Sequence, residues 1–231
     1  MDWRRAAVVG ASGGIGAALC DRLEKAGTEV HRFSRGGEGH IPLDLTDEAS
    51  VAAAADAVRG TGPFDLVFVA SGYLHKKGEG PEKDWRHLDA SEMARNFAVN
   101  AAGPALVAKH FLPLLPVEGR AGFAALSARV GSISDNRLGG WYGYRASKAA
   151  LHQIIRTLSV ELARKRPDAF CAALHPGTVD TGLSKPFQGN VPDGKLFTPD
   201  YSAQHLLAVL QTLEPAQSGR IFAWDGKEIE P

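Results

Sequence analysis

The stretch VVGASGGIG, residues 8–16, joins a short apolar run to a helical pattern through a cluster of glycines. The apolar run has the length of a buried strand, and apolar residues recur at every fourth position after the glycines, as on one face of a helix. Gly10, Gly14 and Gly16 are spaced G-x-x-x-G-x-G, a variant of the dinucleotide fingerprint G-x-G-x-x-G. Such glycines let the backbone approach a pyrophosphate, which the N-terminus of the following helix attracts. The spacing on its own also fits a plain glycine-rich turn.

Outward from this turn, short apolar runs alternate with longer helical patterns to the end of the chain. The predicted strands are 6–10, 29–34, 40–45, 64–72, 121–128, 169–177 and 219–226. The predicted helices are 15–27, 46–60, 91–115, 141–166 and 198–213. Gly27 is predicted to end the first helix, Thr46 to begin the second, and Thr198 to cap the last one just before Pro199. Gly103 and Pro104 favour a kink in the helix 91–115. This order predicts an α/β Rossmann fold, a doubly wound parallel sheet of about seven strands with helices on both faces.

We expect a single NAD(P)-binding domain over 1–231, because no linker, repeat or low-complexity block interrupts the alternation. The segment 182–200 is rich in Gly and Pro. It is predicted to form a substrate lid over the carboxyl ends of the strands, where ligands bind in such sheets, or else a plain surface excursion.

Composition narrows the classes of function. The 231 residues carry 26 Lys and Arg against 26 Asp and Glu, and this balance argues against nucleic acid as a partner. Cys20 and Cys171 are too few for a disulfide framework, and no spacing typical of a metal site occurs. No apolar run approaches the roughly 20 residues that span a bilayer, and the N-terminus lacks the apolar core of a signal peptide. We therefore expect a cytoplasmic protein with neither a metal nor a membrane as its partner.

The end of the second predicted strand bears on the cofactor. NAD sites usually carry an acidic residue there, whereas this strand ends with Ser34 and Arg35. Arg35 can pair with a 2′-phosphate, which favours NADP(H) over NAD(H), or it can be an ordinary surface arginine. Asp44 and Leu45, after the third strand, are placed to meet the adenine, although Asp44 equally suits a turn before the next helix.

Five motifs together resemble the short-chain dehydrogenase/reductase family over nearly the whole chain. They are GASGGIG (10–16), VASG (69–72), FAVNAAG (97–103), YRASK (144–148) and HPGTVDTG (175–182). The stretches WYGYRASKAAL, GSISDN and AWDGKEI make the sequence most similar to the branch that contains C-factor and the sniffer-type carbonyl reductases. The resemblance implies a nicotinamide cofactor, a small-molecule carbonyl or alcohol substrate and a homodimer or homotetramer packed through helices 91–115 and 142–166.

The resemblance assigns the family's YxxxK motif to Tyr144 and Lys148, and helix geometry agrees with it. The two residues are four apart and share a face, whereas Tyr142 lies about 240° around the helix from Lys148. A nearby ammonium is expected to lower the pKa of Tyr144 from its usual value of about 10. Tyr144 is then predicted to act as general acid in carbonyl reduction, and the family role of Lys148 is to bond the nicotinamide ribose. An exposed Tyr–Lys pair of no catalytic use is the alternative.

The catalytic serine departs from the family pattern. The family usually has paired serines at the end of the fifth strand, the second of them catalytic, but here Ala128 occupies the second position. Ser127 and Ser132 are the candidates. Ser132 is preferred, because neighbouring strand residues face opposite ways and Ser127 is expected to point away. Either serine also fits a loop cap.

The resemblance adds one more catalytic residue and a set of cofactor contacts. Asn100 matches a helix asparagine that orders a proton relay through the lysine, or it is a buried polar residue satisfied within the helices. Ala70 and Ser71 stand where the family more often has Asn-Ala. The cofactor-binding residues that the motifs predict, besides Ser34, Arg35, Asp44 and Leu45, are Gly10, Ser12, Gly14, Ile15, Gly16, Ala70, Ser71, Gly72, Tyr144, Lys148, Pro176, Gly177, Val179 and Thr181.

These residues predict an NADP(H)-dependent oxidoreductase that transfers a hydride between nicotinamide and a carbonyl or secondary alcohol, with the segments 73–88 and 182–200 setting the substrate. Two alternatives stay open. One is an NAD-linked alcohol dehydrogenase, if Arg35 does not bind a phosphate. The other is a cofactor-binding signalling or scaffold protein with weak catalysis, which the unusual Ala128 allows.

Overall fold

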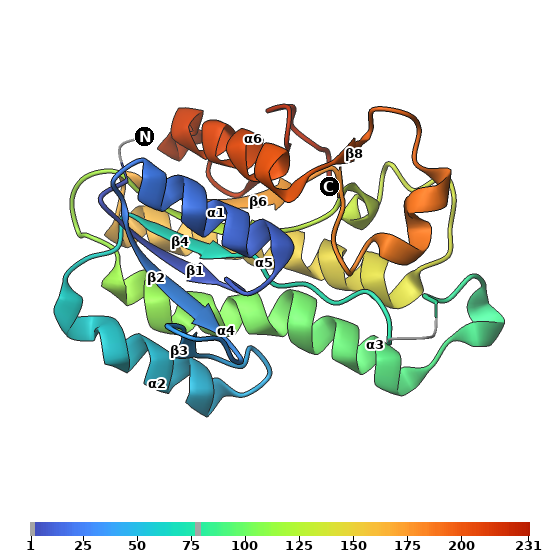
Figure 1. Ribbon diagram of the computed structural model, residues 1–231, viewed down its shortest axis with the longest axis horizontal. Helices are drawn as coiled ribbons and strands as arrows, with labels where there is room; N and C mark the ends of the chain where they lie inside the picture. The colour runs from blue at the N-terminus through green and yellow to red at the C-terminus, as the bar shows by residue number, and fades with distance from the viewer. Residues whose placement is uncertain (1–2, 77–79) are drawn as a thin grey trace.

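A seven-stranded sheet forms the centre of the computed structural model, which describes residues 3–76 and 80–231 (Figure 1). All neighbouring strands run parallel, in the order β3-β2-β1-β4-β5-β6-β9. The strands are β1 Arg5–Val9, β2 Glu29–Ser34, β3 Ile41–Pro42, β4 Leu66–Val69, β5 Ala121–Leu126, β6 Ala169–His175 and β9 Arg220–Ala223. The order reverses between β1 and β4, which is the switch point of a doubly wound sheet. The predicted Rossmann fold is confirmed.

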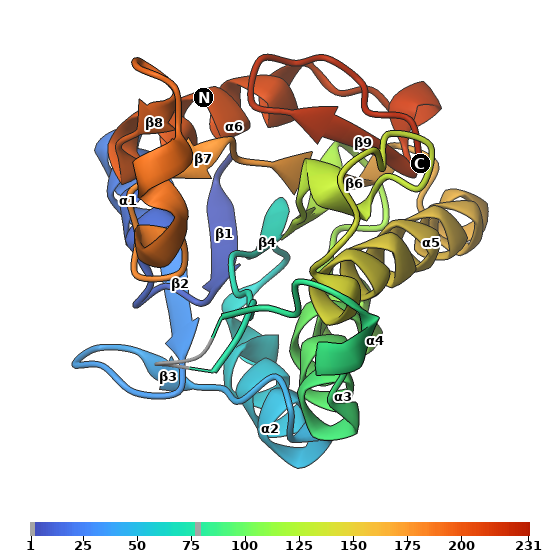
Figure 2. The ribbon, with the colours of Figure 1, turned by 90° about the vertical axis from the view of Figure 1, so that its right-hand side faces the viewer.

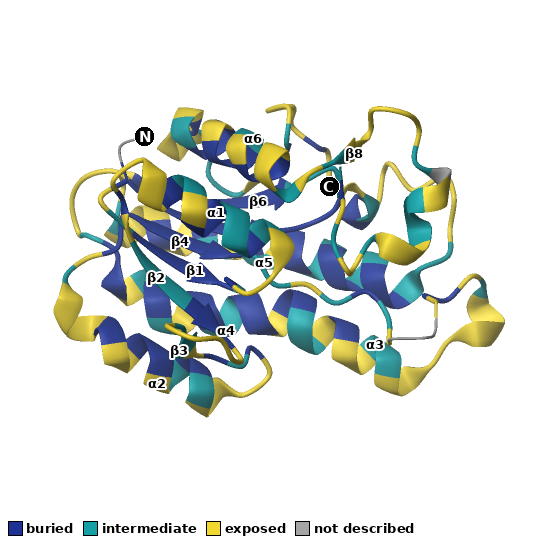
Figure 3. Cartoon of the chain, in the orientation of Figure 1, coloured by how far each residue is buried: buried dark blue, intermediate teal, exposed yellow. Residues whose placement is uncertain are grey.

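Helices cover both faces of the sheet. They are α1 Gly14–Lys25, α2 Glu48–Val58, α3 Ala90–Phe97, α4 Gly103–Phe111, α5 Tyr142–Lys165 and α6 Pro199–Thr212. Helices α1 and α6 lie on one face, and α2, α4 and α5 lie on the other (Figure 2). The helices bury their apolar sides against the sheet and expose their polar sides (Figure 3).

The pleat of β5 sorts its residues between two apolar clusters. Phe123 and Ala125 pack in the cluster that holds Leu151 and Ile155 of α5, whereas Ala124 joins the cluster beneath α1 and α6. Every residue of β5 is buried, as expected for a central parallel strand covered on both faces. Because side chains alternate along a strand, Ser127 lies on the same face of the sheet as Phe123 and Ala125, which is the face that α5 covers.

Several predicted element boundaries are wrong; the fourth strand, for example, is Leu66–Val69 and not 64–72. The second helix begins at Glu48 with Asp47 as its cap, and not at Thr46, because the Asp47 carboxylate accepts the Ala49 N–H at 3.0 Å. The third strand is only Ile41–Pro42 and not 40–45, although the Leu43 N–H still donates to the Ser34 carbonyl oxygen at 2.9 Å.

The helix predicted over 91–115 is interrupted, as Gly103 and Pro104 suggested. A π-helical segment, Ala98–Ala102, separates α3 from α4, and Pro104 lies in the first turn of α4. Proline cannot donate the helical hydrogen bond to the residue four positions earlier, which is Asn100. The bulge therefore occurs at a predicted site residue, as π-bulges often do.

The segment 182–200 is held at both ends by a small sheet that the sequence did not predict. Two short parallel strands, β7 Thr178–Val179 and β8 Leu196–Phe197, pair beside α6 (Figure 2). A short 3₁₀ helix, Lys185–Asn190, lies between them. The segment therefore leaves this small sheet after β7 and returns to it at β8.

Candidate active site

A cavity of about 970 Å³ opens at the carboxyl ends of β1, β4, β5 and β6. Ligands of doubly wound sheets bind at this edge, beside the switch point of the strand order. The predicted residues that line the cavity are Gly10, Ser12, Gly14, Ile15, Ser34, Arg35, Asp44, Leu45, Ala70, Ser71, Gly72, Ser127, Tyr144, Lys148, Pro176 and Thr181. The predicted residues outside its lining are Gly16, Asn100, Ser132, Gly177 and Val179.

The glycine turn brings backbone close to backbone at the floor of the cavity. Gly10 has a φ of +88°, and a Cβ on it would lie 2.5 Å from the Ser71 hydroxyl oxygen. A Cβ on Gly16 would lie 2.2 Å from the carbonyl oxygen of Gly10, so that this glycine shapes the turn from behind. No side chain caps α1 at Gly13, and the first turn of α1 therefore presents backbone N–H groups to an anion.

The far end of the cavity carries the residues predicted to select the cofactor. Arg35 is exposed at the rim, and Ser34 is buried, with its hydroxyl 2.7 Å from the Gly36 carbonyl oxygen. Asp44 also lines the cavity while its carboxylate accepts the Thr46 N–H at 2.9 Å. That hydrogen bond is the main reason why the pKa of Asp44 is lowered. Asp44 therefore stabilises the turn before α2 and also lines the cavity.

Tyr144 and Lys148 meet in the wall of the cavity, one turn apart on α5. The Lys148 Nζ lies 5.7 Å from the centroid of the Tyr144 ring and donates a hydrogen bond of 2.8 Å to the Leu126 carbonyl oxygen. Both residues are buried and line the cavity, whereas Tyr142 does not line it. The geometry agrees with the predicted choice of Tyr144.

The expected direction of the Tyr144 pKa is wrong. Burial raises the pKa of Tyr144 to about 12 and lowers the pKa of Lys148 to about 7. Desolvation dominates because the lysine is bonded to a backbone carbonyl and does not reach the phenol oxygen with a hydrogen bond in this structure. At neutral pH the tyrosine is therefore protonated and able to donate.

Ser127, and not Ser132, lies in the wall of the cavity. The Ser127 N–H continues the β5 ladder to the Leu174 carbonyl oxygen, and the pleat turns its side chain toward α5. Its hydroxyl oxygen is 2.6 Å from His152 Nε2. The Ser132 hydroxyl instead accepts the Asp135 N–H at 3.2 Å, away from the cavity. The structure thus places Ser127 in the lining of the cavity and Ser132 outside it, and the choice of the catalytic serine stays a prediction.

Asn100 lies behind the cavity and connects two of its walls. Its side-chain oxygen accepts the Tyr73 N–H at 2.9 Å, and its side-chain nitrogen donates to the Tyr73 carbonyl oxygen at 2.7 Å. The same nitrogen is 3.1 Å from the Ser147 hydroxyl of α5. Asn100 is fully buried, and its amide is satisfied by the Tyr73 backbone together with Ser147 and Asn96. It holds the chain after β4 against α5.

Three aromatic rings that sequence reasoning did not single out gather beside Tyr144. Trp141 lies 6.2 Å from the Tyr144 ring and 5.0 Å from the ring of Phe187, which belongs to the segment 182–200. His75 lies 5.4 Å from Phe187 on its other side. The three come from separate parts of the chain, and only the assignment of 73–88 and 182–200 to substrate binding hinted at them. Of the three residues, His75 lines the cavity, whereas Trp141 and Phe187 are not in its lining.

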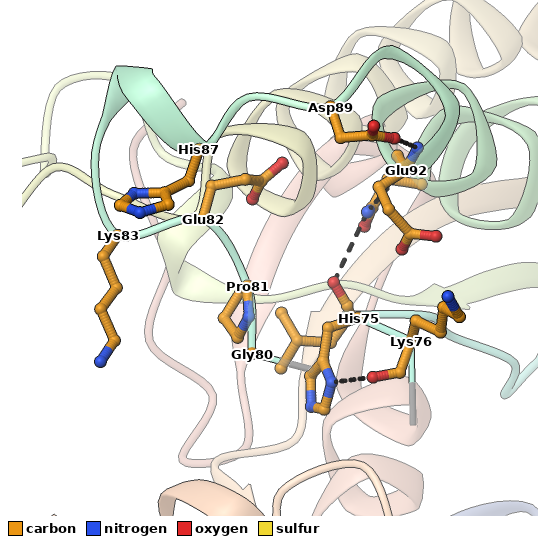
Figure 4. Close-up of a pocket in the computed structure, with 11 residues that line it drawn as sticks. His75, Lys76, Gly80, Pro81, Glu82, Lys83, His87, Asp89 and Glu92 are labelled. Carbon is orange, nitrogen blue, oxygen red and sulfur yellow. Dashed lines mark hydrogen bonds between the residues drawn. The ribbon is translucent and has the colours of Figure 1, made fainter. Parts of the chain in front are cut away.

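A smaller cavity of about 430 Å³ adjoins these residues near the start of α3 (Figure 4). Its lining includes the polar and charged residues His75, Lys76, Glu82, His87 and Asp89. Within the predicted substrate segment 73–88, residues 77–79 lie outside the described part of the chain. Glu82 is 8% exposed, and its carboxylate accepts the Gly143 N–H at 3.2 Å, in the first turn of α5. This contact ties the segment to the helix that carries Tyr144.

In residues 3–76 and 80–231, no group of three or more His, Cys, Asp and Glu side chains is placed to hold a metal ion. In the same described ranges, no helix is long and apolar enough to cross a membrane.

The strand order, the glycine turn and the cavity at the carboxyl ends define an α/β protein of the Rossmann type. A family model described as short chain dehydrogenase matches residues 4–191. The chain therefore belongs to the short-chain dehydrogenase family, which is a family of oxidoreductases, as the motifs predicted.

Individual relatives agree with this family. C-signal of Myxococcus xanthus is 39% identical over 73% of this chain and 93% of its own length. The 1-hydroxy-2-glutathionyl-2-methyl-3-butene dehydrogenase of a Rhodococcus species is 30% identical over 96% of this chain and 97% of its own. Among solved structures, an NADPH-bound carbonyl reductase from chicken fatty liver is 26% identical, with a TM-score of 0.85 and full coverage of both chains. The carbonyl reductase Sniffer of D. melanogaster, 22% identical with a TM-score of 0.83 and 99% of each chain covered, shares the fold.

Proposed function

We propose that this protein is an NADP(H)-dependent reductase of small carbonyl compounds, with the reverse oxidation of secondary alcohols at the same site. The observation that carries the proposal is the buried pair of Tyr144 and Lys148 in the wall of the cavity that the glycine turn opens. A protonated phenol in a wall of low polarity is a suitable general acid for a carbonyl oxygen.

The residues of the cavity fit a dinucleotide. Side chains at Gly10 or Gly14 would fill the floor, since a Cβ on Gly14 would lie 3.1 Å from Thr181 Cγ2. The first turn of α1 would hold the pyrophosphate, and the exposed Arg35 guanidinium would hold a 2′-phosphate. The NADPH carried by the chicken carbonyl reductase supports the same choice. When bound, the nicotinamide supplies or accepts the hydride at its C4 atom.

Tyr144 donates the proton of the reaction in reduction and accepts it in oxidation. With its pKa raised to about 12, the Tyr144 hydroxyl is protonated at neutral pH and donates to the substrate carbonyl oxygen as that carbon becomes an alcohol. The resulting phenolate accepts the proton back from solvent or, in the oxidation direction, from the alcohol. Lys148 lies one turn away and stabilises the phenolate when it carries its own proton. Its lowered pKa, about 7, makes that charge sensitive to pH near neutrality.

The segment 182–200 would act as the substrate lid of a single domain. Phe187 of this segment packs on Trp141 and His75, and Gly182 and Leu183 of the same segment line the cavity. We also propose a homodimer or homotetramer through the helices of 91–115, which are α3 and α4, and through α5; Phe97 of α3 and Val160 of α5 are exposed to 37% and 43%. Sedimentation of the purified protein measures the oligomeric state, and a monomer at micromolar concentration would exclude this part.

The test of the activity is NADPH oxidation with a panel of aldehydes, ketones and quinones, comparing the wild type with Tyr144→Phe. We expect Tyr144→Phe to bind NADPH normally and to lose turnover by about 100-fold or more, as for a lost general acid. Arg35→Asp should shift the cofactor preference toward NADH. Equal use of NADPH by Arg35→Asp and wild type would refute the role of Arg35.

One observation keeps a second function under consideration. Ala128 packs against Tyr144 with Leu74 and offers no hydroxyl at the position of the family's serine. A cofactor-binding signalling protein with weak catalysis is compatible with this, and one relative, at 39% identity, carries the name C-signal. Tight NADPH binding without Tyr144-dependent turnover on any compound of the panel would favour it.

A further inference from the structure

An arginine that lies over a tyrosine ring lines the large cavity on the side of α3. The Arg95 Cζ atom is 4.7 Å from the centroid of the Tyr73 ring, and both residues belong to the lining of the cavity. Within the part of the chain that the structure describes, the Arg95 guanidinium makes no hydrogen bond and no ion pair. The function proposed above gives Arg95 no role.

The ring beneath Arg95 is held by three hydrogen bonds. The Tyr73 hydroxyl donates to the Glu92 carboxylate at 2.6 Å, and the Tyr73 backbone N–H and carbonyl oxygen both bond the Asn100 side chain. The face of an aromatic ring attracts a guanidinium, whose N–H groups can still pair with a planar anion through two parallel hydrogen bonds. Tyr73 therefore orients Arg95 and leaves its donors available to a ligand in the cavity.

The charges around the cavity favour an anion as that ligand. The basic residues in its lining are Arg35, Lys76, Arg95 and Lys148. Among the residues described, Asp44 is the one acidic residue in the same lining. Glu92 lines the smaller cavity instead (Figure 4), and its carboxylate already accepts the phenol proton of Tyr73. An acidic group near Arg95 would therefore meet positive charge on the walls of the large cavity.

The contacts of Tyr73 place Arg95 close to the helix that carries the proposed general acid. Asn100, which binds both backbone groups of Tyr73, also donates to the Ser147 hydroxyl of α5 at 3.1 Å. The Ser147 hydroxyl in turn donates to the Tyr144 carbonyl oxygen at 2.9 Å. Two side chains therefore connect the backbone of Tyr73 with that of Tyr144.

Arg95 is distant from the adenine end of the cavity. Leu45 lies against Gly103, where a Cβ would be 2.9 Å from the Leu45 Cβ. Arg95 precedes Gly103 by eight residues in the helical run from α3 to α4, which corresponds to about 12 Å. Arg35 follows β2, whereas Tyr73 follows β4, two strands away and so about 10 Å across the sheet. The proposed function already gives the cofactor's phosphates to Arg35 and to the first turn of α1, which leaves Arg95 for the substrate.

We propose that Arg95 binds a carboxylate of the substrate, so that this protein reduces carbonyl compounds that carry an acidic group away from the reacting carbon. The inference rests on the proposed reductase function and specifies its substrate class. The carboxylate pairs with Arg95 while the carbonyl oxygen takes its proton from Tyr144. The pairing moves neither atoms nor electrons, so the balance of the reaction is unchanged.

The test uses three variants and a matched control. Arg95→Gln removes the charge, Arg95→Lys keeps the charge without the paired N–H groups, and Tyr73→Leu removes the ring beneath the guanidinium. The control Arg86→Gln removes another arginine that lies over an aromatic ring, 5.7 Å from the Trp85 centroid and outside the lining of both cavities. Thermal midpoints identify any variant that has merely lost folding.

The substrates are two acids of different length, 4-carboxybenzaldehyde and 4-formylcinnamic acid, each compared with its methyl ester by NADPH oxidation. The measured quantity is the ratio of kcat/KM for the acid to kcat/KM for its ester. We expect Arg95→Gln to lower this ratio by about 10- to 100-fold for at least one acid, as for a lost charge-assisted hydrogen bond. Arg95→Lys and Tyr73→Leu should lower it by about three- to tenfold, and the control should keep the wild-type ratio. An unchanged ratio for both acids in Arg95→Gln would refute the proposal.

A titration with NADPH separates the acid of the substrate from the phosphates of the cofactor, since an arginine binds either anion. The dissociation constant of NADPH, measured by quenching of tryptophan fluorescence, should differ by less than about threefold between Arg95→Gln and the wild type. A larger loss of NADPH affinity would assign Arg95 to a cofactor phosphate and overturn the inference.

Binding of the two acids can also be measured without turnover. Saturation-transfer NMR in the presence of NADP⁺, which has no hydride to give, compares each acid with its ester. We expect at least one acid to bind the wild type about fivefold or more tightly than Arg95→Gln, and the esters to bind both proteins alike. Acid binding that does not depend on Arg95 would overturn the inference even in an active enzyme. Conversely, Arg95-dependent binding in a protein without Tyr144-dependent turnover would support the acid site and place the failure in the proposed reaction.

Discussion

Gly16→Ala should damage both stability and cofactor binding, although alanine is the better helix former. Helix propensity alone favours alanine over glycine by about 1 kcal/mol inside α1. The new Cβ, however, would lie 2.2 Å from the Gly10 carbonyl oxygen, and backbone must move by at least 0.8 Å to restore 3.0 Å. Overpacking of this kind costs about 1–3 kcal/mol, so the net change is a loss of up to about 2 kcal/mol. Because Gly10 forms the floor of the cavity, the shift should also weaken NADPH binding at least about tenfold.

The matched control is Gly60→Ala. Gly60 has nothing within 4 Å of a new Cβ and no positive φ, so alanine there should stabilise the protein by about 0.4–1 kcal/mol. Urea unfolding measures the free energy of unfolding of each variant, and quenching of tryptophan fluorescence measures NADPH affinity. If Gly16→Ala were as stable as Gly60→Ala and bound NADPH like the wild type, the close approach of α1 to the turn would not be what holds the site.

Three further substitutions test the walls of the cavity. The free energy of unfolding of the wild type relative to Lys148→Met, measured with urea, should rise as the pH goes from 7 to 9. Burial lowers the pKa of Lys148 to about 7, against 10.5 in the unfolded chain, so that between these two values the unfolded state binds more protons than the folded state. Glu82→Ala removes the acceptor of the Gly143 N–H and should cost about 1 kcal/mol in the same assay, with a fall in kcat; unchanged values would mean that α5 does not need this cap. Phe187→Ala should raise KM for aromatic carbonyls about 3- to 10-fold and leave KM for small aliphatic ones within about twofold, whereas equal effects on both would exclude a contact between Phe187 and the substrate.

The sequence was sufficient for the parts of the site that follow from local periodicity. The glycine turn, the order of strands and the shared face of Tyr144 and Lys148 each depend on spacings of a few residues, and the structure agrees with them. The serine shows where this reasoning ends. The alternation of a strand states only that Ser127 and Ala128 face opposite ways, and which of the two faces α5 depends on how the sheet packs. Residues outside the motif, such as His152, then decide what the hydroxyl can do.

The Tyr144 pKa shows a related limit. A neighbouring charge four residues away can be read from the sequence, but the desolvation that opposes it cannot, because it depends on everything that packs around the ring. In the folded protein, Ala128 and Leu74 cover the ring, and the Lys148 ammonium is held by a backbone carbonyl. The sign of the pKa shift is therefore a property of the packing.

The start of α5 connects these observations. Trp141 precedes the helix with a φ of +55°, which among the residues described is found at no other non-glycine position, and such a conformation persists only where surrounding contacts hold it. Here the Trp141 N–H bonds the Glu82 carbonyl oxygen at 2.6 Å, and the Glu82 carboxylate accepts the Gly143 N–H. The same tryptophan packs against Tyr144 and Phe187. The segment around Glu82 therefore holds the start of α5, and a change in that segment should alter the position of Tyr144 even where it does not contact the substrate.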